Sequence, residues 1–462
     1  MTASTPAIDP SIFKAYDIRG VVDKTLTTDA VYWIGRALGA EAAARDEQRI
    51  FVARDGRLSG PTLIQVLIRG LREAGRDVTD LGMVPTPVLY FAASALGTGS
   101  GVMLTGSHNP PDYNGLKMVL AGTTLAGEDI QGLRERIETG NLSQGEGGLD
   151  QADVLPQYIE RIVADVKLAR PMKVVVDCGN GVAGVAAPRL LRALGCEVSE
   201  LFCAVDGHFP NHHPDPSQPE NLEDLQRALR ERPADIGLAF DGDGDRLGVV
   251  TPQGRVIWPD RQMMLYARDV IARNPGAEII YDIKCTRHLD SIIREAGGRP
   301  TMWKTGHSLV KAKLKESGAL LAGEMSGHIF FKERWYGFDD ALYTAARLLE
   351  ILAADGRPAD DIFAALPDSI NTPELKLHTA EGENHALMEK LQAAAEFADA
   401  RVTTIDGIRV DFADGFGLVR ASNTTPCLVI RFEAEDEAGL ARIQDEFRRL
   451  ILSQAPTAEL PF

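Results

Sequence analysis

The fold is decided by one run of segments in the middle of this 462-residue chain: KVVVDCGNG (173–181), PRLLRALG (188–195), CEVSELF (196–202) and DIGLAFDGDGDR (235–246). These segments predict, in order, a strand, a helix, a second strand and a buried third strand that opens into a polar, glycine-bearing loop. Strands that alternate with helices in this way are typical of an α/β domain.

The same order of segments occurs before and after this run. Its upstream copy comprises RIFVARD (49–55), TLIQVLIRGLREAG (62–75) and VMLTGSHNP (102–110). Its downstream copy comprises EIIYDIKCTR (278–287), HLDSIIREAG (288–297), RPTMWKTGH (299–307) and ALLAGEMSGHIFF (319–331). We infer three related α/β domains with mixed sheets, each of which delivers a polar loop from the end of a buried strand.

The last part of the chain has a different pattern. IRVDFADGFGLVRASNTTPCLVIRFEA (408–434) alternates apolar and polar residues around turn signals, and DEAGLARIQDEFRRLI (436–451) has the period of a helix. We therefore expect a small α+β C-terminal domain. With linkers near residues 150, 256 and 367, where Pro367 could act as a hinge, the predicted domains are 1–152, 153–255, 256–367 and 368–462.

Composition restricts the class of protein. Hydrophobic residues make up 44% and charged residues 25% of the chain, which is ordinary for a folded globular protein. The formal net charge of −17 opposes nonspecific binding to nucleic acid or to an anionic membrane, because both are negative. The five cysteines form no CxxC pair, and the sequence contains neither a signal peptide nor an apolar stretch of about 18 residues. We expect a cytoplasmic protein without a membrane anchor.

A candidate nucleophile lies in TGSHNPPDYNG (105–115), where Ser107 falls between a strand and a rigid Pro-Pro turn. A serine becomes a phosphoryl acceptor when a base takes its proton and a cation offsets the incoming charge. His108 and Lys117 are the nearest groups for these two roles. Taken alone, the segment also fits a turn of Ser, His, Asn and Pro that has no chemical role.

Three carboxylates follow the buried strand 235–240. Asp241, Asp243 and Asp245 alternate with glycines and can point to one side, and hard oxygen ligands at this density suit Mg²⁺ or Ca²⁺. An EF-hand is excluded, because its sixth and twelfth loop positions would be Arg246 and Pro252 instead of Gly and Glu. A solvated acidic turn is the alternative. The abrupt change from an apolar strand to three carboxylates favours a metal, with Arg246 as a neighbouring phosphate ligand.

The segment GNGVAG (179–184) follows a strand, so it has the spacing and position of a dinucleotide-binding fingerprint. Glu197 or Glu200 could supply the acidic residue that such a site places about twenty positions later. Asp177 ends the strand, however, and would put a negative charge close to the pyrophosphate, which opposes this function. A nucleotide-dependent dehydrogenase with saturable NAD binding is therefore an alternative from another class.

Two further loops combine groups that recognise sugars and phosphates. GEMSGH (323–328) offers Glu324, Ser326 and His328, a mixture of acceptors and donors that suits paired sugar hydroxyls. RASNTTP (420–426) combines a guanidinium with hydroxyl and amide donors on a turn between strands, which suits a phosphate. Each loop alone also fits an ordinary turn. The four polar loops come from four different domains, however, and together they could close one cleft.

Taken together, TGSHNPPDYNGLK, FDGDGDR, GEMSGH and RASNTTP resemble the α-D-phosphohexomutase superfamily, and the similarity runs from KAYDIRG (14–20) to the last domain. GEMSGH and RASNTTP look most like its bacterial phosphomannomutase/phosphoglucomutase branch. The resemblance implies four domains around a central cleft. It also implies interconversion of the 6- and 1-phosphates of mannose and glucose through a phosphoserine and a hexose 1,6-bisphosphate.

The resemblance also assigns roles to individual residues. The implied catalytic residues are the phosphoserine Ser107, together with His108, Lys117 and Arg246. The implied Mg²⁺ ligands are Ser107, Asp241, Asp243 and Asp245. The implied substrate-binding residues are Tyr16, Arg19, Lys284, His307, Glu324, Met325, Ser326, Gly327, His328, Arg420, Ala421, Ser422, Asn423, Thr424 and Thr425.

The expected partners are mannose and glucose 1- and 6-phosphates, with hexose 1,6-bisphosphate as intermediate and activator, and we expect a monomer. A phosphoglucosamine mutase is the second activity considered, and it would turn over glucosamine 6-phosphate. A noncatalytic sugar-phosphate binding protein is an alternative of another class, because it would bind its ligand without needing Ser107. Supply of nucleotide-sugar precursors for surface polysaccharide is an expectation at the level of the family.

Overall fold

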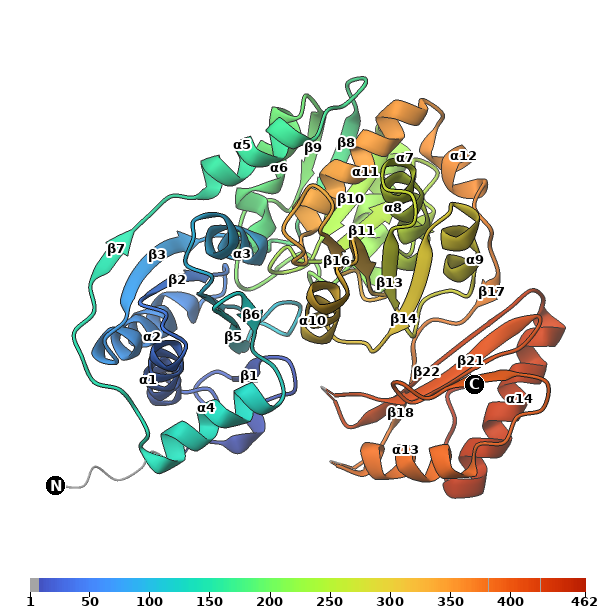
Figure 1. Ribbon diagram of the computed structural model, residues 1–462. Helices are drawn as coiled ribbons and strands as arrows, with labels where there is room; N and C mark the ends of the chain where they lie inside the picture. The colour runs from blue at the N-terminus through green and yellow to red at the C-terminus, as the bar shows by residue number, and fades with distance from the viewer. Residues whose placement is uncertain (1–7, 381, 424) are drawn as a thin grey trace.

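The computed structural model describes residues 8–380, 382–423 and 425–462, which form four separate sheets. We call them the first to the fourth unit, and their strands fall within residues 18–151, 173–257, 278–331 and 370–434. Figure 1 shows the units following one another in an arc, from blue through green and yellow to red. Among the described residues, no helix is both long and apolar enough to cross a membrane.

The first unit is a mixed sheet with helices on both faces. Its strands are β1 (Ile18–Val21), β2 (Arg49–Arg54), β3 (Asp77–Met83), β4 (Gly101–Leu104), β5 (Tyr113–Leu120), β6 (Thr123–Thr124) and β7 (Leu149–Gln151). Its helices are α1 (Thr28–Ala44), α2 (Gly60–Glu73), α3 (Thr86–Ala95) and α4 (Glu128–Thr139), after the 3-10 helix η1 (Pro10–Ile12). β3, β2 and β4 are parallel neighbours in that order, and β5 pairs antiparallel with β4.

The second unit repeats this order in space. Its strands are β8 (Lys173–Asp177), β9 (Glu197–Leu201), β10 (Ile236–Phe240), β11 (Leu247–Val250) and β12 (Val256–Ile257). Its helices are α5 (Leu155–Asp165), α6 (Ala187–Ala193) and α7 (Glu223–Glu231), with the 3-10 helices η2 (Val182–Val185) and η3 (Pro219–Leu222). β9, β8 and β10 are parallel neighbours, and β11 pairs antiparallel with β10. Every residue of β10 is buried, which explains its continuous apolar sequence.

The third unit has the same arrangement in a smaller sheet. Its strands are β13 (Glu278–Asp282), β14 (Arg299–Trp303), β15 (Leu321–Gly323) and β16 (Ile329–Phe331). Its helices are α8 (Pro259–Arg273), α9 (His288–Glu295), α10 (His307–Ser317), α11 (Ala341–Asp355) and α12 (Ala359–Ala364). β14, β13 and β15 are parallel neighbours, and β16 pairs antiparallel with β15. The predicted set of three related α/β domains with mixed sheets is therefore confirmed.

The fourth unit is antiparallel throughout its strand pairs. Its strands are β17 (Ile370–Asn371), β18 (Leu375–His378), β19 (Arg401–Thr403), β20 (Ile408–Asp411), β21 (Gly415–Ala421) and β22 (Cys427–Ala434), and its helices are α13 (Glu383–Ala394) and α14 (Glu437–Gln454). Both helices pack on β21 and β22, as the predicted α+β domain requires. The predicted domain boundaries stay predictions, and β12, which follows the boundary at residue 255, pairs with β11 in the second sheet.

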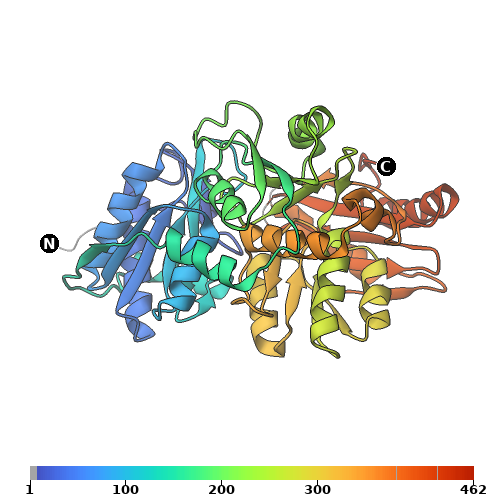
Figure 2. The ribbon, with the colours of Figure 1, turned by 90° about the horizontal axis from the view of Figure 1, so that it is seen from above.

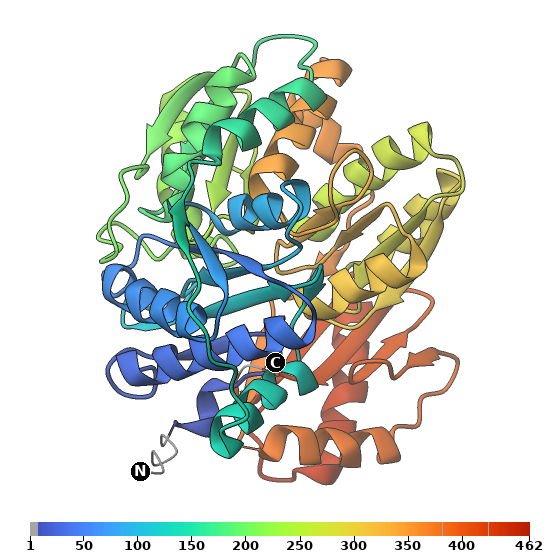
Figure 3. The same ribbon diagram turned by 60° about the vertical axis from the view of Figure 1, so that its left-hand side comes forward.

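The apolar cores of the first three units are connected to one another, whereas the core of the fourth unit is separate. Alternate residues of β2 face two different apolar cores. Ile50 and Val52 pack in the core under α1 and α2, two helices that lie side by side (Figure 3). Phe51 and Ala53 face the other core, which continues through the second and third units. Helix α11 packs on α6 and α8, and Figure 2 shows it lying between the second and third units. The fourth unit has a separate core of its own residues. The first three units thus form one body, to which the fourth is attached.

Candidate active site

The candidate site is built from the same loop position in each of the first three units, namely the connection from the third parallel strand to the antiparallel fourth. The β4 to β5 loop carries Ser107, the β10 to β11 loop carries residues 241–246, and the β15 to β16 loop carries residues 324–328. The fourth unit contributes the hairpin between β21 and β22, residues 422–426. These are the four polar loops that the sequence singles out.

Ser107 is 2% exposed and occupies the left-handed region of the backbone, with φ 49°. Its N–H donates to Thr105 Oγ1 at 2.8 Å, and its Oγ lies 3.2 Å from His108 Nδ1 and 3.3 Å from Asp241 Oδ2. A Cβ at Gly242 would lie 2.2 Å from the Ser107 carbonyl oxygen, so only glycine permits this approach. The nucleophile loop and the carboxylate loop are therefore in direct backbone contact.

Arg57, which the sequence analysis missed, holds the backbone of the Ser107 loop in place through hydrogen bonds. The buried Arg57 guanidinium donates to the carbonyl oxygens of Ser107 (2.9 Å), Asn109 (2.6 Å) and Tyr113 (2.9 Å). Asp55 accepts from Arg57 Nε at 3.2 Å and from the Thr105 hydroxyl at 2.8 Å. A buried guanidinium with several acceptors fixes a loop firmly, because freeing it would leave a charge unpaired.

The three carboxylates of the second unit converge as predicted. Asp241, Asp243 and Asp245 are fully buried, and each places an oxygen within 4.8 Å of the others. Lys117 of β5 forms ion pairs with Asp243, at 2.7 Å, and with Asp245. The Thr86 hydroxyl donates to Asp243 at 2.6 Å. The first and second units thus meet through a dense set of charges.

Electrostatics and unpaired atoms favour a cation at these carboxylates. Burial and the neighbouring Asp245 and Asp243 raise the pKa of Asp241 well above its usual value. Burial alone would raise the pKa of Asp243 too, but Lys117 lowers it below its usual value. Within the part of the chain that the structure describes, Asp243 Oδ1 and Asp245 Oδ1 are buried and have no hydrogen-bond partner. Oxygen atoms left in this state are suitable ligands for a hard divalent ion.

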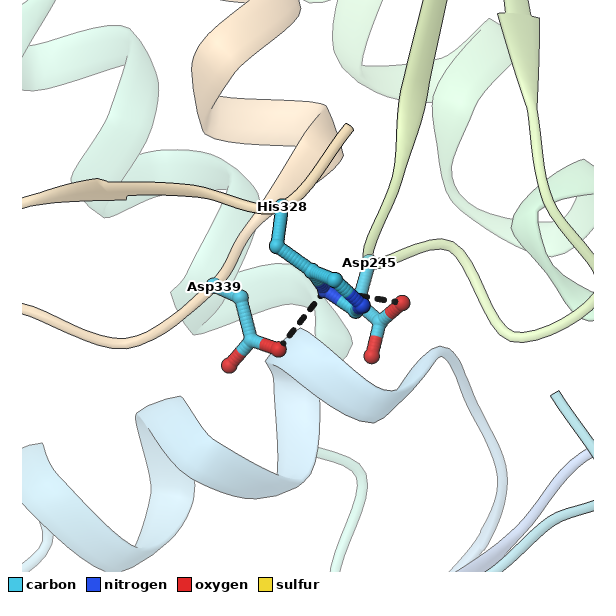
Figure 4. A group of neighbouring side chains, drawn as sticks. All are labelled: Asp245, His328 and Asp339. Carbon is cyan, nitrogen blue, oxygen red and sulfur yellow. Dashed lines mark ion pairs between the residues drawn. The ribbon is translucent and has the colours of Figure 1, made fainter. Parts of the chain in front are cut away.

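The second and third units meet through Arg246, His328 and Asp339. Arg246 Nε donates to His328 Nε2 at 3.0 Å, and His328 Nδ1 lies 3.0 Å from Asp339 Oδ2 and 3.5 Å from Asp245 Oδ1. Figure 4 shows His328 lying between the two carboxylates. Asp339 also pairs with Lys311 at 2.9 Å, and this cation and His328 hold the pKa of Asp339 well below its usual value although burial opposes the shift.

His108 is placed to exchange a proton with Ser107. Burial, reinforced by the positive charges of Arg246, Arg19 and Lys117, lowers the pKa of His108 well below its usual value. The imidazole is therefore neutral near pH 7 and can accept a proton. His213 donates through Nε2 to the His108 carbonyl oxygen, which ties the loop between β9 and η3 to the Ser107 loop.

The loop of the third unit is fixed by its own backbone. Glu324 is 1% exposed and accepts from the Gly306 N–H at 2.5 Å, and the Met325 N–H donates to Asp282 at 3.3 Å. Gly327 has φ 102°, and its neighbours Ser326 and His328 lie on the same tight turn. His307 is buried beside it, with its ring centroid 5.5 Å from that of His328.

The hairpin between β21 and β22 is linked to two other units. Asn423 donates to the Tyr16 hydroxyl of the first unit, and this hydroxyl donates to the Thr305 carbonyl oxygen at 3.0 Å. Burial raises the pKa of Tyr16 to about 12, so the hydroxyl keeps its proton. Ser422 and Thr425 lie with their hydroxyl oxygens 3.0 Å apart. Ala421 is buried at the end of β21, and Thr424 lies outside the described residues.

The cations near this hairpin are paired with carboxylates that the sequence analysis missed. Arg420 donates to Asp406 at 3.0 Å, and Lys284 donates to Glu374 at 2.5 Å. On the opposite side, Arg19 donates to Asn109 Oδ1 of the nucleophile loop at 3.0 Å. Arg19 also pairs with Asp17, so its guanidinium is held between its own strand and the Ser107 loop.

Four family models match the chain in succession: the phosphoglucomutase/phosphomannomutase alpha/beta/alpha domains I, II and III over residues 10–144, 156–254 and 258–370, and the C-terminal domain over residues 374–450. The chain belongs to the phosphoglucomutase/phosphomannomutase family. The suspected resemblance to the phosphohexomutases is thereby confirmed over nearly the whole chain.

Members of the phosphoglucomutase/phosphomannomutase family resemble this chain along its length. A phosphomannomutase/phosphoglucomutase of Pseudomonas aeruginosa is 60% identical over 461 residues, covering 100% of both chains. A phosphoglucomutase of Neisseria gonorrhoeae is 57% identical and covers 97% of this chain and 98% of its own. A crystal structure of a phosphoglucomutase/phosphomannomutase family protein from Burkholderia thailandensis superposes with a TM-score of 0.95 at 60% identity, covering 99% of this chain and 100% of that one.

In this family member the glycine-rich segment 179–184 does not form a nucleotide site. A Cβ at Gly181 would lie 2.9 Å from the Gly242 carbonyl oxygen, so this glycine allows the loop to pack against the carboxylate loop. Asp177 accepts from His212 at 3.0 Å and from the Gly179 N–H at 2.9 Å, where a pyrophosphate would need donors. The glycine in this segment therefore allows two loops of the second unit to pack against each other.

Proposed function

We propose that this chain interconverts the 6-phosphates and 1-phosphates of mannose and glucose through a phosphorylated Ser107 and a hexose 1,6-bisphosphate. The observation that carries the proposal is the position of Ser107, whose Oγ lies 3.3 Å from Asp241 at the contact between the first and second units. A serine that only forms a turn would not need a histidine and a buried carboxylate beside its hydroxyl, or a lysine that pairs with the same carboxylate cluster.

We propose that the metal is Mg²⁺ and that Asp241, Asp243 and Asp245 bind it together with an oxygen of the Ser107 phosphoryl group. The donor set fits, because it consists of buried carboxylates, two of which have an oxygen without a hydrogen-bond partner. When bound, the ion neutralises charge on the phosphoryl group as it is transferred. Lys117, which pairs with two of these carboxylates, holds them in place.

The reaction has two half-reactions, and the second reverses the chemistry of the first on the other phosphoryl group. In the first, the bond between phosphorus and Ser107 Oγ breaks and phosphorus bonds to the free hydroxyl oxygen of the hexose monophosphate. The hydroxyl loses one proton, and Ser107 Oγ gains one from His108, which lies 3.2 Å away through Nδ1. In the second, the bond between the other phosphorus and its sugar oxygen breaks and that phosphorus bonds to Ser107 Oγ. The serine proton returns to His108, and the released sugar oxygen takes up a proton. Transfer of this loose kind depends mainly on positioning and charge stabilisation.

The fourth unit is proposed to bind the phosphate that is not reacting. Arg420, Ser422, Asn423 and Thr425 supply a guanidinium, hydroxyls and an amide on one hairpin, and Lys284 adds a second cation. Each charge-assisted hydrogen bond to that phosphate contributes about 1.5–3 kcal/mol. Because both phosphate positions of the bisphosphate must occupy this region in turn, the hairpin binds phosphate without distinguishing C1 from C6.

Specificity for the sugar is proposed to come from Glu324, Ser326 and His328. Hydroxyls that are presented in both orientations of the bisphosphate can be bound by these groups, whereas the configuration at C2 is not read. We expect comparable turnover of mannose and glucose phosphates in parallel assays. A hundredfold preference for one sugar would contradict this part of the proposal, and turnover of glucosamine 6-phosphate would favour the phosphoglucosamine mutase.

The experiment for the central claim is mass analysis of the intact protein and its peptides before and after incubation with glucose 6-phosphate and Mg²⁺. We expect a phosphoryl group on Ser107 that is gained or lost with sugar phosphates, and a loss of activity on the order of 10⁴-fold in Ser107→Ala. Ser291→Ala is the matched control, because Ser291 is an exposed hydroxyl on α9. Binding of sugar phosphate without phosphorylation of Ser107 under any condition would favour a noncatalytic binding protein.

We also propose that the enzyme works as a cytoplasmic monomer. Its proposed domains are 1–152, 153–255, 256–367 and 368–462. We propose that the fourth domain closes over the bound substrate by a hinge motion at the linker around Pro367. The location of the reactive loops within one chain supports the monomer, since all four loops come from the same polypeptide. Light scattering at working concentrations tests the oligomeric state, and small-angle scattering with saturating substrate tests the closure. No compaction would contradict closure of the fourth domain.

A further inference from the structure

Two cysteine sulfur atoms lie in contact at one edge of the second unit, and the proposed reaction uses neither of them. Cys178 Sγ and Cys203 Sγ are 3.5 Å apart, and both residues are free thiols. β8 and β9 are parallel neighbours whose register pairs Asp177 with Leu201. Cys178 follows Asp177 directly and Cys203 follows Leu201 by two residues, so both thiols lie where the two strands end. Neighbouring strands are about 4.8 Å apart, a spacing that a disulfide can bridge.

The two thiols have different surroundings. Cys178 is fully buried in the core that the first three units share, whereas Cys203 is half-buried and precedes the exposed Ala204. The hydrogen bond from Cys203, together with burial, raises the pKa of Cys178 well above its usual value. A small dissolved oxidant therefore reaches Cys203 first, and Cys178 stands behind it as a second thiol. Cysteines that sense oxidants often have such a partner, which converts the first oxidation product into a disulfide.

A bound metal ion is a poorer explanation of the pair. Zinc takes four ligands in structural sites, usually thiolates and imidazoles. Within the ranges that the structure describes, the groups of three or more potential ligands lie elsewhere, at residues 241–245 and around His328. Two thiols can also pack as small apolar groups without any chemical role. This alternative predicts that neither thiol is oxidised in preference to the other cysteines.

We propose that Cys178 and Cys203 form a redox-active site, at which hydrogen peroxide produces a disulfide that slows the reaction at Ser107. The formation of the disulfide is independent of the proposed function, whereas its effect on the rate rests on that function. In a reducing compartment a disulfide of this kind is transient.

The chemistry has two steps. In the first, the Cys203 thiolate sulfur bonds to one oxygen of the peroxide, the bond between the two oxygens breaks, and the hydroxide that leaves takes up the proton lost by Cys203. Cys203 is then a sulfenic acid. In the second, Cys178 loses its proton, its sulfur bonds to the Cys203 sulfur, and the displaced hydroxide takes up this proton. Two thiols are oxidised and one peroxide is reduced, which gives one disulfide and two waters.

The segment 179–184 connects the pair to the carboxylate loop. A Cβ at Gly184 would lie 2.0 Å from the Cys203 carbonyl oxygen, so the segment packs closely on Cys203. The Val182 N–H donates to the Gly242 carbonyl oxygen at 3.1 Å. A disulfide brings the two sulfur atoms from 3.5 Å to about 2.05 Å. Because Cys178 is enclosed by a closely packed core, part of this movement comes from the backbone and is passed on to the carboxylate loop.

The first readout is the covalent link itself. The reduced protein is incubated with hydrogen peroxide, its remaining thiols are alkylated, and peptides prepared without reductant are analysed by mass spectrometry. We expect one linked pair of peptides that contains Cys178 and Cys203, and we expect dithiothreitol to separate them. Oxidation of the other cysteines before this pair, or oxidation of Cys203 without a link to Cys178, would overturn the inference.

Three variants identify the role of each thiol. In Cys178→Ala, which avoids burying a hydroxyl, we expect a sulfenic acid on Cys203 that dimedone traps. In Cys203→Ser we expect Cys178 to stay reduced, because the sulfur that meets the oxidant is gone. Cys196→Ala is the matched control, since Cys196 is a buried thiol of the same unit that precedes β9, whereas Cys203 follows it. The control should form the disulfide as the wild type does.

The second readout is the rate of the mutase reaction. We expect kcat of the oxidised wild type to fall on the order of tenfold, because a small displacement of the reacting groups is costly, and to recover with dithiothreitol. The same peroxide treatment should leave kcat of Cys203→Ser unchanged, which excludes oxidation of methionines as the cause. Full activity in protein whose disulfide is complete would overturn the link to the active site. A reduced wild type without mutase activity would instead overturn the proposed function, and the disulfide would still be measured by mass.

Discussion

The two ends of the proposed site, the reactive end around Ser107 and the phosphate-binding end at the β21–β22 hairpin, are constructed differently. Ser107, Lys117 and Asp241 are at most 3% exposed, and they belong to units that share one continuous apolar core. Arg420 and Asn423 belong to the fourth unit, whose apolar core is separate. The fourth unit meets the third through a small apolar contact, in which Ile283 packs on Phe416 and Leu418, and through ion pairs.

This difference corresponds to two different physical demands. Phosphoryl transfer requires the nucleophile, carboxylates and cations to be held in fixed positions, and a shared core that is closely packed provides this. The proposed bisphosphate would have to exchange its two ends between half-reactions, so the part proposed to bind its second phosphate would have to release and rebind it. A unit with its own core and a mostly polar joint can move as a body, because movement breaks few apolar contacts.

The largest expected effect is a loss of catalytic rate when the reactive end is altered. Asp243→Asn removes a charge that Lys117 and the metal both require, and we expect kcat to fall on the order of 10³-fold in assays with excess Mg²⁺. Chelation of the metal from the wild type should abolish activity, and added Mg²⁺ should restore it. Asp290→Asn, a partly exposed carboxylate paired with Arg294 on α9, is the control. Equal activity of the two variants would remove the metal from the mechanism.

The next largest effect tests whether the two cores are separate. Phe447 is fully buried in the core of the fourth unit, with its ring centroid 5.5 Å from that of Phe432. Phe447→Ala should cost about 3–5 kcal/mol, and scanning calorimetry should then resolve an early transition of the fourth unit. Phe363→Ala, in the core of the first three units, should lower the later transition instead. If both variants shift one common transition, the two cores unfold as one.

A smaller effect is expected at the phosphate-binding end. Arg420→Ala should weaken binding of hexose phosphates about 10- to 100-fold, because one charge-assisted contact is lost and Asp406 is left without its cation. Isothermal titration of the phosphate-free enzyme measures this directly. Arg420→Lys, which keeps the charge, should recover part of the affinity. A change in kcat alone, with binding intact, would place Arg420 at the reactive end.

The smallest effect concerns the pH dependence of stability near the reactive end. Burial lowers the pKa of His212, but the hydrogen bond and charge of Asp177 outweigh it and raise the pKa above 6.5. The group therefore stabilises the fold fully below the unfolded pKa, and this contribution is lost as pH rises through the folded value. We expect the melting temperature to fall slightly from about pH 6 to about pH 9, and less in His212→Gln. Identical slopes would contradict this.

The parts of the site that could be predicted from the sequence are local. Ser107 and Asp241 each follow a buried strand directly and stand among glycines and prolines, so a short window contains both the strand and the loop. The repetition of this pattern also gave the number and class of the domains, since an α/β unit is recognised from strands that alternate with helices. These features need no knowledge of distant contacts.

The residues that could not be predicted act through partners far away in the chain. Asp339 and Glu374 stand in no motif, and they become significant only because folding places them beside His328 and Lys284. Long-range ion pairs leave no periodic signal, and a single carboxylate in a sequence is usually an exposed one. Arg57 is an intermediate case, because it follows β2 in ARDGR and could have been noticed as a charged group after a buried strand.

The recurrence of one loop position has a consequence for how such a protein can diversify. Each of the loops after β4, β10 and β15 leaves one strand and enters its hydrogen-bonded neighbour, so its two ends are clamped together independently of its sequence. The chain therefore has three loops of this kind, each held at both ends by paired strands. The residues of one such loop can change without disturbing the strands that hold it, but they have to fit the neighbouring loop, because Gly242 packs on the Ser107 carbonyl oxygen and Arg246 donates to His328.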